Sequence, residues 1–198
     1  QKSNSAKGMR YDFITVGDVV HDIFIRIPED GAFVSAGDHP KLSFPYGAKV
    51  PFETVYDVPG VGNTANAAVA ASRLGLSVAF VSNVGDDYTG RTIIDHLKAE
   101  GIAADFVTVN KNKLSNRHFV LWYKDDRTIL IKHEDYGYHL PAIEPPRWMY
   151  FSSIAQGHER FHDDIAEYVR QNDVKLVFQP GTFQIKLGAR ALKNLYTH

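Results

Sequence analysis

Two parts of this sequence have the residue types and the spacing to bind a ligand rich in hydroxyl groups. Asp22 follows the apolar run 13–16 and the break at Gly17 and Asp18, and a glycine-rich stretch starts at Gly60. Carboxylates and side-chain amides form paired hydrogen bonds with hydroxyl groups, and glycine lets the backbone approach a ligand closely. An acid just past the C-terminal end of a strand lies where open α/β sheets bind their ligands. From the residues alone, it is equally consistent that Asp22 is an acidic residue in an exposed turn and binds no ligand.

The glycine-rich stretch predicts a turn, a helix, a buried strand and a second turn, in that order, over 60–63, 66–74, 78–82 and 83–87. Asn63 or Thr64 is expected to cap the helix, because a side-chain oxygen there can accept a hydrogen bond from a free backbone amide. The alanines of the segment favour helix, and Gly75 is the expected residue just past its end. The stretch therefore predicts one unit of an α/β fold.

The rest of the chain alternates between strand and helix patterns. The expected strands cover 13–16, 21–27, 52–58, 105–109, 118–123, 128–133, 148–152 and 174–178, and the expected helices cover 88–100, with Thr89 as N-cap, 158–172 and 183–196. This alternation indicates a parallel sheet covered by helices, so the predicted class is α/β. The strands 21–27 and 52–58 are partly polar and suggest a small separate sheet, which the three strands between 105 and 133 could extend.

Composition narrows the class of protein. The 198 residues fit one domain, and a net charge of −1 gives no sign of binding to nucleic acid or to an anionic membrane. The chain has no cysteine, which excludes disulfides and thiolate metal sites and is compatible with a cytoplasmic location. No apolar run approaches the ~20 residues that span a bilayer. Residues 1–9 are small and polar and are expected to be a disordered leader or a tag remnant.

Two runs of residues contain the residue types that bind metal ions, but neither predicts a metal site. His158-Glu159-x-x-His162 matches the H-E-x-x-H pattern of zinc proteases, but it lies in the polar first turn of a helix and no third ligand is evident. The residues of His133-Glu134-Asp135 alternate between the two faces of a strand, so they cannot close one site. We therefore expect no metal site in this chain.

A dinucleotide site is a further alternative. Residues 60–65 fit G-x-G-x-x-A after a strand and before a helix, which is the context of an NAD-binding Rossmann domain. The preceding strand is too polar for a central parallel strand, and the strand 78–82 carries no acid at its tip to hold a ribose hydroxyl. These two features weigh against NAD.

A longer pattern resembles the ribokinase-like (PfkB) family of carbohydrate kinases. The matching residues are Gly17 with Asp22, Gly62-Asn63-Thr64-Ala65-Asn66, Arg73-Leu74-Gly75, Gly85-Asp86-Asp87-x-x-Gly90 and Asp126-Arg127-Thr128. The resemblance covers nearly the whole chain from Tyr11. It implies a three-layer α/β core with a small β-sheet lid, which would be formed by about 21–58 and 104–136 of the domain 10–198.

The resemblance also implies a function. Members of the family transfer the γ-phosphate of ATP, with Mg²⁺, to a hydroxyl of a sugar, nucleoside or related polyol. The positions that match Asp22, Gly62, Asn63 and Asn66 bind the substrate. A closing lid excludes water, so that the phosphate passes to the sugar and not to solvent. A homodimer through the lid sheet is implied as well.

The chain also departs from the family pattern. Val61 stands where one of two paired glycines is usual, and Ser152-Ser153-Ile154 has no acid where many ribose kinases carry one, which makes ribose a less favoured substrate. Neither the Asn-x-x-Glu nor the Gly-Ala-Gly-Asp motif of the family is present, so no residue is assigned as catalytic base and the nucleotide site is mostly missing. The chain is thus expected to be the substrate-binding half and lid of a kinase, inactive alone. The alternative is a non-catalytic polyol-binding or dimerising module.

Overall fold

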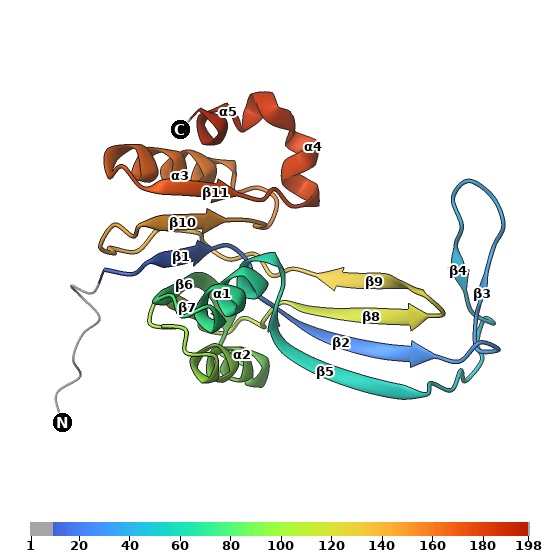
Figure 1. The fold of residues 1–198 in the computed structure, drawn as a ribbon. Coiled ribbons are helices and arrows are strands. Elements are labelled where there is room, and N and C mark those ends of the chain that lie inside the picture. Colours follow the sequence, from blue (N-terminus) through green and yellow to red (C-terminus); the bar gives the residue numbers. More distant parts are fainter. Residues whose placement is uncertain (1–9, 198) are drawn as a thin grey trace.

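The computed structural model describes residues 10–197, so the predicted leader at 1–9 lies outside the described residues. A five-stranded parallel sheet forms the centre of the molecule (Figure 1). Its strands, in spatial order, are β11 (Lys175–Phe178), β10 (Trp148–Phe151), β1 (Phe13–Val16), β6 (Val78–Gly85) and β7 (Val107–Asn110). The chain thus has the parallel sheet that the strand–helix alternation predicts.

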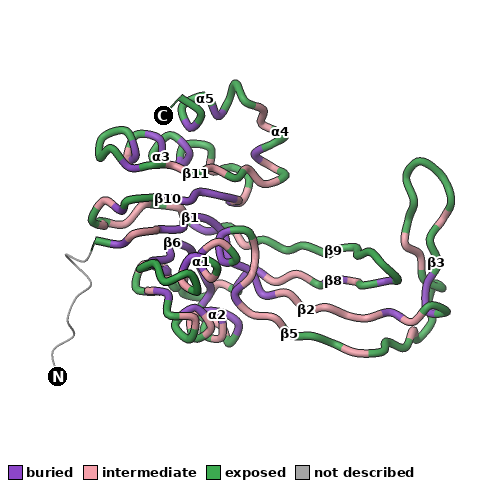
Figure 2. Tube along the Cα trace, viewed as in Figure 1, coloured by how far each residue is buried: buried purple, intermediate pink, exposed green. Residues whose placement is uncertain are grey.

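Helices cover both faces of this sheet, because successive residues of each strand point to opposite sides. Val78 and Phe80 pack toward α1 (Asn63–Arg73) and α2 (Tyr88–Ala99). Ala79 and Val81 pack in the second core, which contains residues of α3 (Glu159–Gln171) and α5 (Lys193–Tyr196). The result is a three-layer core, and Figure 2 shows the buried residues concentrated in its strands.

A second sheet of four strands extends away from the core (Figure 1). Its strands, in spatial order, are β5 (Thr54–Val61), β2 (Val20–Ile27), β8 (Arg117–Tyr123) and β9 (Asp126–Lys132), and β3 (Phe33–Val34) pairs with β4 (Leu42–Ser43) in a separate hairpin. β2 and β8 run parallel, while the other neighbouring pairs are antiparallel. All seven residues of β9 are exposed, so this edge strand faces solvent.

Two strand predictions need correction. The expected strand 105–109 belongs to the central sheet as β7 and does not extend the small sheet, because its backbone pairs with β6 over Ser82–Gly85. The same pairing carries β6 past the predicted end at 82, so that 83–85 are strand and not turn. The Asn110 side-chain amide donates to Asn83 Oδ1 and to the Val84 carbonyl oxygen, which satisfies polar groups that the sequence pattern assigns to a turn.

The turn before α1 is shorter than expected. Gly60 lies within β5 at a φ of +65°, where the pairing of β5 with β2 shifts register by one residue, so it forms a bulge. Gly62 alone makes the turn, with a φ of 102°, and it is the N-cap of α1. Neither Asn63 nor Thr64 caps the helix, because the helix already begins at Asn63 and has no side-chain cap. The first amides of α1 therefore remain free of a capping side chain.

The caps of the other helices also differ from expectation. Asp87, and not Thr89, is the N-cap of α2, and its carboxylate accepts a hydrogen bond from the backbone amide of Gly90 at 2.8 Å. Asp87 Oδ1 also accepts from the Ser115 hydroxyl at 2.6 Å, which joins α2 to the segment that enters β8. Burial alone would raise the pKa of Asp87, but the hydrogen bonds from Ser115 and Gly90 outweigh it and lower that pKa.

The C-terminal helix is interrupted. The expected helix 183–196 is formed by α4 (Thr182–Ala191), which contains non-helical backbone at Gly188, followed by α5. Gly188 has a φ of 79° and a ψ of 160°, a conformation that side-chain-bearing residues rarely adopt. Within residues 10–197, none of the helices has the length and apolar character that crossing a bilayer requires.

Replacement of Gly85 tests the contact between the end of β6 and the loop before β8. A Cβ atom at Gly85 would lie 2.8 Å from the Leu114 carbonyl oxygen and closer still to that of Lys113, both of which are backbone atoms. Gly85→Ala should therefore lower the free energy of unfolding by about 1–3 kcal/mol in urea titrations. Gly137→Ala, where a Cβ would meet nothing within 4 Å, is the control. Equal stabilities of the two variants would contradict the packing described here.

Candidate functional site

A cavity of about 580 Å³ lies between the two sheets. Its walls come from the segment between β1 and β2, the start of α1, the strands β8 and β9, and the segments that follow β10 and β11. The lining residues are Asp18, Val20, Asp22, Gly62, Asn63, His118, Ile129, Ile131, His133, Ser153, Ile154, Ala155, Gln156, Gly181, Thr182, Phe183 and Gln184. The cavity therefore lies at the C-terminal edge of the parallel strands, where open α/β sheets bind ligands.

Gly17 brings the walls of this cavity together. It follows β1 directly, with a φ of +145°, and a Cβ atom there would lie 2.6 Å from Thr64 Oγ1 and 2.9 Å from the Ser153 carbonyl oxygen. Any side chain would push α1 and the segment after β10 away from the strand end. The missing side chain thus allows the start of α1, the end of β1 and the end of β10 to meet at one point.

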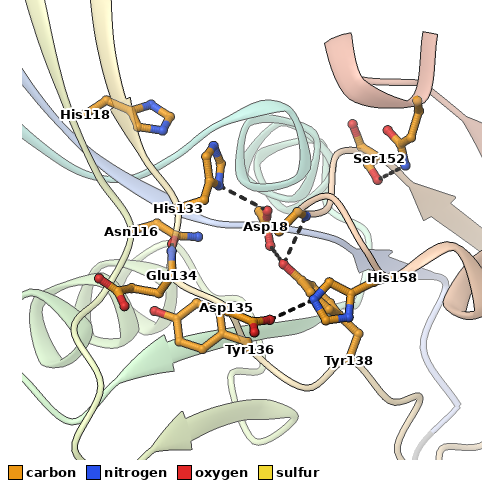
Figure 3. Close-up of polar contacts among 12 residues, drawn as sticks. Asp18, Asn116, His118, His133, Glu134, Asp135, Tyr136, Tyr138, Ser152 and His158 are labelled. Atoms are coloured by element: carbon orange, nitrogen blue, oxygen red, sulfur yellow. Dashed lines mark hydrogen bonds and ion pairs between the residues drawn. The ribbon is translucent and has the colours of Figure 1, made fainter. Parts of the chain in front are cut away.

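Asp18 occupies the inner wall. It is 6% exposed, and its Oδ1 accepts a hydrogen bond of 2.6 Å from the Tyr138 hydroxyl (Figure 3). Tyr138 in turn accepts a hydrogen bond of 3.2 Å from the Ala155 amide. Burial and the neighbouring Asp18 carboxylate both raise the pKa of Tyr138, so its hydroxyl remains a donor at neutral pH. His133 Nδ1 lies 3.4 Å from the other oxygen of Asp18.

Asp22 lies on β2 opposite His118 of the parallel strand β8. Asp22 Oδ1 is 3.3 Å from His118 Nδ1, and the two side chains are 18% and 14% exposed. The rings of His118 and His133 meet edge to face, with 5.2 Å between their centroids. Figure 3 shows His133 beside Asp18 and His118 beyond it, and both imidazoles line one cavity with the carboxylates of Asp18 and Asp22.

The predicted substrate residues do not all line the cavity. Asp22, Gly62 and Asn63 do, and the free amides at the start of α1 give this wall a partial positive charge. Asn66 lies one turn further along α1, where it is exposed and is not part of the lining. Its backbone amide donates to the Gly62 carbonyl oxygen at 2.8 Å.

Sequence reasoning missed Asp18, His118, His133 and Gln184. Asp18 carries the same signal as Asp22, an acid just past a strand, and could have been found by it. His118 gives no such signal, because its approach to Asp22 depends on the register of two strands that are far apart in the sequence. Gln184 is buried at the start of α4, where its side chain donates to the Ser152 carbonyl oxygen at 3.1 Å and accepts from the Gly181 amide at 2.7 Å.

The two histidines of the H-E-x-x-H pattern have separate partners. His158 Nε2 is 3.0 Å from Asp135 Oδ1, as Figure 3 shows. His162 is buried, its Nε2 lies 3.0 Å from Gln184 Nε2, and burial lowers its pKa. Across residues 10–197, no three His, Cys, Asp or Glu side chains gather in a way that could hold a metal ion.

The glycine pattern at 60–65 does not have the structural context of a dinucleotide site. The strand before it, β5, is the antiparallel edge strand of the small sheet, whereas the fingerprint follows a central parallel strand. Gly60 packs against a side chain of α2, because a Cβ there would approach the ring of His96. The glycines of the pattern therefore have structural roles: Gly60 forms a bulge in β5, and Gly62 is the N-cap of α1.

Comparison with known proteins gives consistent matches. The pattern shared by the pfkB family carbohydrate kinases matches residues 40–183. A ribokinase from Bacillus subtilis (strain 168) is 34% identical over 129 residues, which are 62% of this chain and 44% of that protein. The chain spans about half the length of the curated relatives it matches.

Solved structures show the same fold. A PfkB protein from Polaromonas sp. JS666 superimposes with a TM-score of 0.68 at 18% identity, over 93% of this chain and 62% of that one. A ribokinase from Cryptococcus neoformans var. grubii serotype A, solved in complex with ADP, superimposes with a TM-score of 0.65 at 19% identity, over 92% of this chain and 54% of that one. These similarities confirm the predicted ribokinase-like α/β fold.

The hydrogen bond that Tyr138 donates to Asp18 can be tested by stability. Tyr138→Phe removes the hydroxyl, which leaves the buried Asp18 carboxylate without this donor and the Ala155 amide without this acceptor. The free energy of unfolding should fall by about 1–3 kcal/mol in urea titrations. Tyr46→Phe, at a fully exposed tyrosine, is the control and should leave the midpoint unchanged. A loss of the same size in both variants would show that the hydroxyl of Tyr138 has no special role.

Proposed function

The chain belongs to the pfkB family of carbohydrate kinases, and from this membership we propose that it supplies the substrate-binding part of an enzyme that phosphorylates a sugar, nucleoside or related polyol. ATP donates the γ-phosphate, and a hydroxyl of the substrate accepts it. The observation that supports this most is the cavity itself, which brings Asp22 together with Gly62 and Asn63 from a separate part of the chain. An acid acceptor and free amides in one cavity can satisfy both the hydrogen and the oxygen of a hydroxyl group.

In this proposal Asp22 accepts hydrogen bonds from the substrate, and Gly62, Asn63 and Asn66 hold it from the α1 side. Asn66 is exposed, about one turn of helix away from Asn63 and outside the cavity lining. It would therefore contact the substrate only if the substrate extended out of the cavity or if the Asn66 side chain turned toward it. Ser152-Ser153-Ile154 offers no carboxylate at the opposite wall. The proposed substrate is therefore a compound that carries hydroxyl groups, and ribose is not singled out among such compounds.

The small sheet serves as the lid. Five of its residues line the cavity, namely Val20, Asp22, His118, Ile129 and Ile131. The lid strands lie at Val20–Ile27, Thr54–Val61, Arg117–Tyr123 and Asp126–Lys132, while β7 of the proposed range 104–136 belongs to the core. A lid that closes over the substrate keeps water from competing for the phosphate. The exposed edge strand β9 also offers a surface for a homodimer.

We assign no catalytic base, nucleotide or Mg²⁺ ligand to this chain. Within the described part, no group of carboxylates and histidines gathers as a metal site. Phosphoryl transfer depends on the positioning of the reactants and on stabilisation of the charge around the phosphates. ATP with Mg²⁺ would supply the phosphate that is transferred. The proposed contribution of residues 10–197 is to bind the acceptor hydroxyl, orient it and exclude water.

The experiment is an assay of ADP release by the protein at its natural length, over a panel of sugars and nucleosides. Asp22→Asn should lower kcat/KM about tenfold to a hundredfold, because an amide replaces a charge-assisted hydrogen-bond acceptor. Asp125→Asn, at an exposed position in the turn between β8 and β9, is the matched control. Thermal unfolding of both variants verifies that each is folded.

The outcomes separate the possible functions. Failure of the folded protein to release ADP with any polyol would reject the kinase proposal. If calorimetry then shows that the same protein binds a polyol, the chain is a non-catalytic binding module. An Asp22→Asn variant with unchanged kcat/KM and unchanged affinity would remove Asp22 from the site.

A further inference from the structure

A second cavity, of about 370 Å³, lies beside the strands β8 and β9 of the small sheet. Successive residues of a strand point to opposite faces, so Arg117 and Phe119 line this second cavity, whereas His118 lines the cavity between the two sheets. The wall facing the strands is the start of α2, at Tyr88 and Thr89. The small sheet therefore has a cavity on each face, and the proposed function uses only one of them.

We propose that the second cavity binds a small organic anion, which carries a phosphate or carboxylate on a short apolar body. We name it the outer pocket, and its lining includes Asp87, Leu114, Arg117, Phe119, Leu130 and Lys132. The inference goes beyond the proposed function and does not depend on it, because it concerns the other face of the small sheet. The volume of about 370 Å³ suits a small molecule. A protein partner would need a much larger surface, of about 800 Å².

Two like charges lie side by side in the outer pocket. Arg117 of β8 and Lys132 of β9 are directly opposite each other in the antiparallel register, and both side chains line the pocket. Like charges in directly opposite positions destabilise a sheet. An anion bound to both cations replaces this repulsion with attraction, so the pair favours an anionic ligand.

The one carboxylate of the lining already has its own partners. Asp87 Oδ1 accepts hydrogen bonds from the Gly90 amide and the Ser115 hydroxyl, and Asp87 Oδ2 accepts from the Ser115 amide. These bonds hold both oxygens of Asp87 at the cap of α2 and at the segment that enters β8. The lining contains two cations and this single carboxylate, which leaves the outer pocket with one net positive charge.

Both cations retain hydrogen-bond donors for a ligand. The guanidinium of Arg117 has five N–H groups, and among residues 10–197 its side chain donates only to Thr89 Oγ1. Lys132 Nζ lies 2.8 Å from Glu134 Oε1, but the Lys132 side chain is 67% exposed, and an exposed ion pair of this kind contributes little. A phosphate or carboxylate can therefore accept from Arg117 and Lys132 together.

An apolar pair continues the pocket away from α2. Phe119 and Leu130 are also directly opposite in the register of β8 and β9, two residues along the strands from the cationic pair, so they share its face. Their side chains are 39% and 53% exposed, and the exposed Leu114 lines the same pocket. Covering these side chains removes apolar surface from water. The outer pocket thus combines a cationic end with an apolar end, which matches an anion that carries an apolar body.

The test is calorimetry on the protein at its natural length, without ATP or sugar. The probes are hexyl phosphate and hexanoate, compared with hexanol, which lacks the charge, and inorganic phosphate, which lacks the apolar body. At least one of the hexyl anions should bind about tenfold or more tightly than both hexanol and inorganic phosphate. Its affinity should fall as salt is added, because salt screens the charges. Comparison of the two hexyl anions shows which anionic group the outer pocket prefers.

Two variants at exposed positions test the two ends of the outer pocket. Lys132→Gln removes one cation and Leu130→Asn removes apolar surface, and each should weaken binding of the hexyl anion about fivefold or more. The matched controls are Lys111→Gln and Leu74→Asn, which are exposed and lie outside the lining, and they should bind as the unaltered protein does. Thermal unfolding verifies that each variant is folded.

The location of the probe needs its own control, because Ile131 of the edge strand belongs to the linings of both cavities. Asp22→Asn changes the charge of the cavity between the sheets and should leave the affinity for the hexyl anion unchanged. A larger change in this variant than in Lys132→Gln would place the probe in that cavity and overturn the inference.

Three further results would contradict the outer pocket as an anion site. The first is the absence of binding by both hexyl anions, and the second is hexanol binding as tightly as they do. The third is unchanged affinity in both Lys132→Gln and Leu130→Asn. If no probe binds and light scattering shows that Leu130→Asn dissociates a dimer, a second copy of the chain covers this face instead. None of these measurements requires turnover, so they are independent of the assay for ADP release.

Discussion

The close contact at Gly17 is the constraint on which the rest of the site depends. The strand β1 ends there, and the absence of a side chain lets Thr64 of α1 and the backbone of Ser153 approach the same point. Asp18 follows immediately and is held by Tyr138, so its carboxylate is fixed against the cavity. The position of the acid is thus a consequence of close packing and not of a flexible loop.

A second constraint is the parallel pairing of β2 with β8. Antiparallel neighbours can be joined by a short turn, but these two strands are separated by residues 28–116, which include the strands β6 and β7 of the central sheet. Their register places His118 against Asp22, and the hairpin from β8 to β9 then returns the chain so that His133 faces Asp18. The small sheet and the core therefore share one polar cluster, at the place where the two sheets meet.

Much of this architecture could be predicted from the sequence, because hydrophobic periodicity and glycine spacing are local signals. The strand at 13–16 and the helix ending before Gly75 were within reach of such signals, whereas the expectation that Asp22 and Gly62 share one site came from the resemblance to a family. The errors at the end of β6 and at the cap of α2 have one cause, which is that tertiary partners decide the ends of elements. β6 continues to Gly85 because β7 pairs with it, and Asp87 caps α2 because Ser115 from a distant segment also binds it. The contact of His118 with Asp22 depends on a strand register that no local pattern contains.

The same two constraints decide which polar atoms of the cavity have no partner within the protein. Asp18 and Asp22 are largely shielded from water, because their side chains are only 5% and 18% exposed. Burial leaves each carboxylate with fewer partners than it can use, and the unpartnered oxygens point to hydrogen-bond donors of a ligand. A neutral hydroxyl supplies such a donor without adding charge, whereas an anion adds charge and supplies none. The shielding that leaves these oxygens without a partner is therefore also what would favour a hydrogen-bond donor from a ligand there.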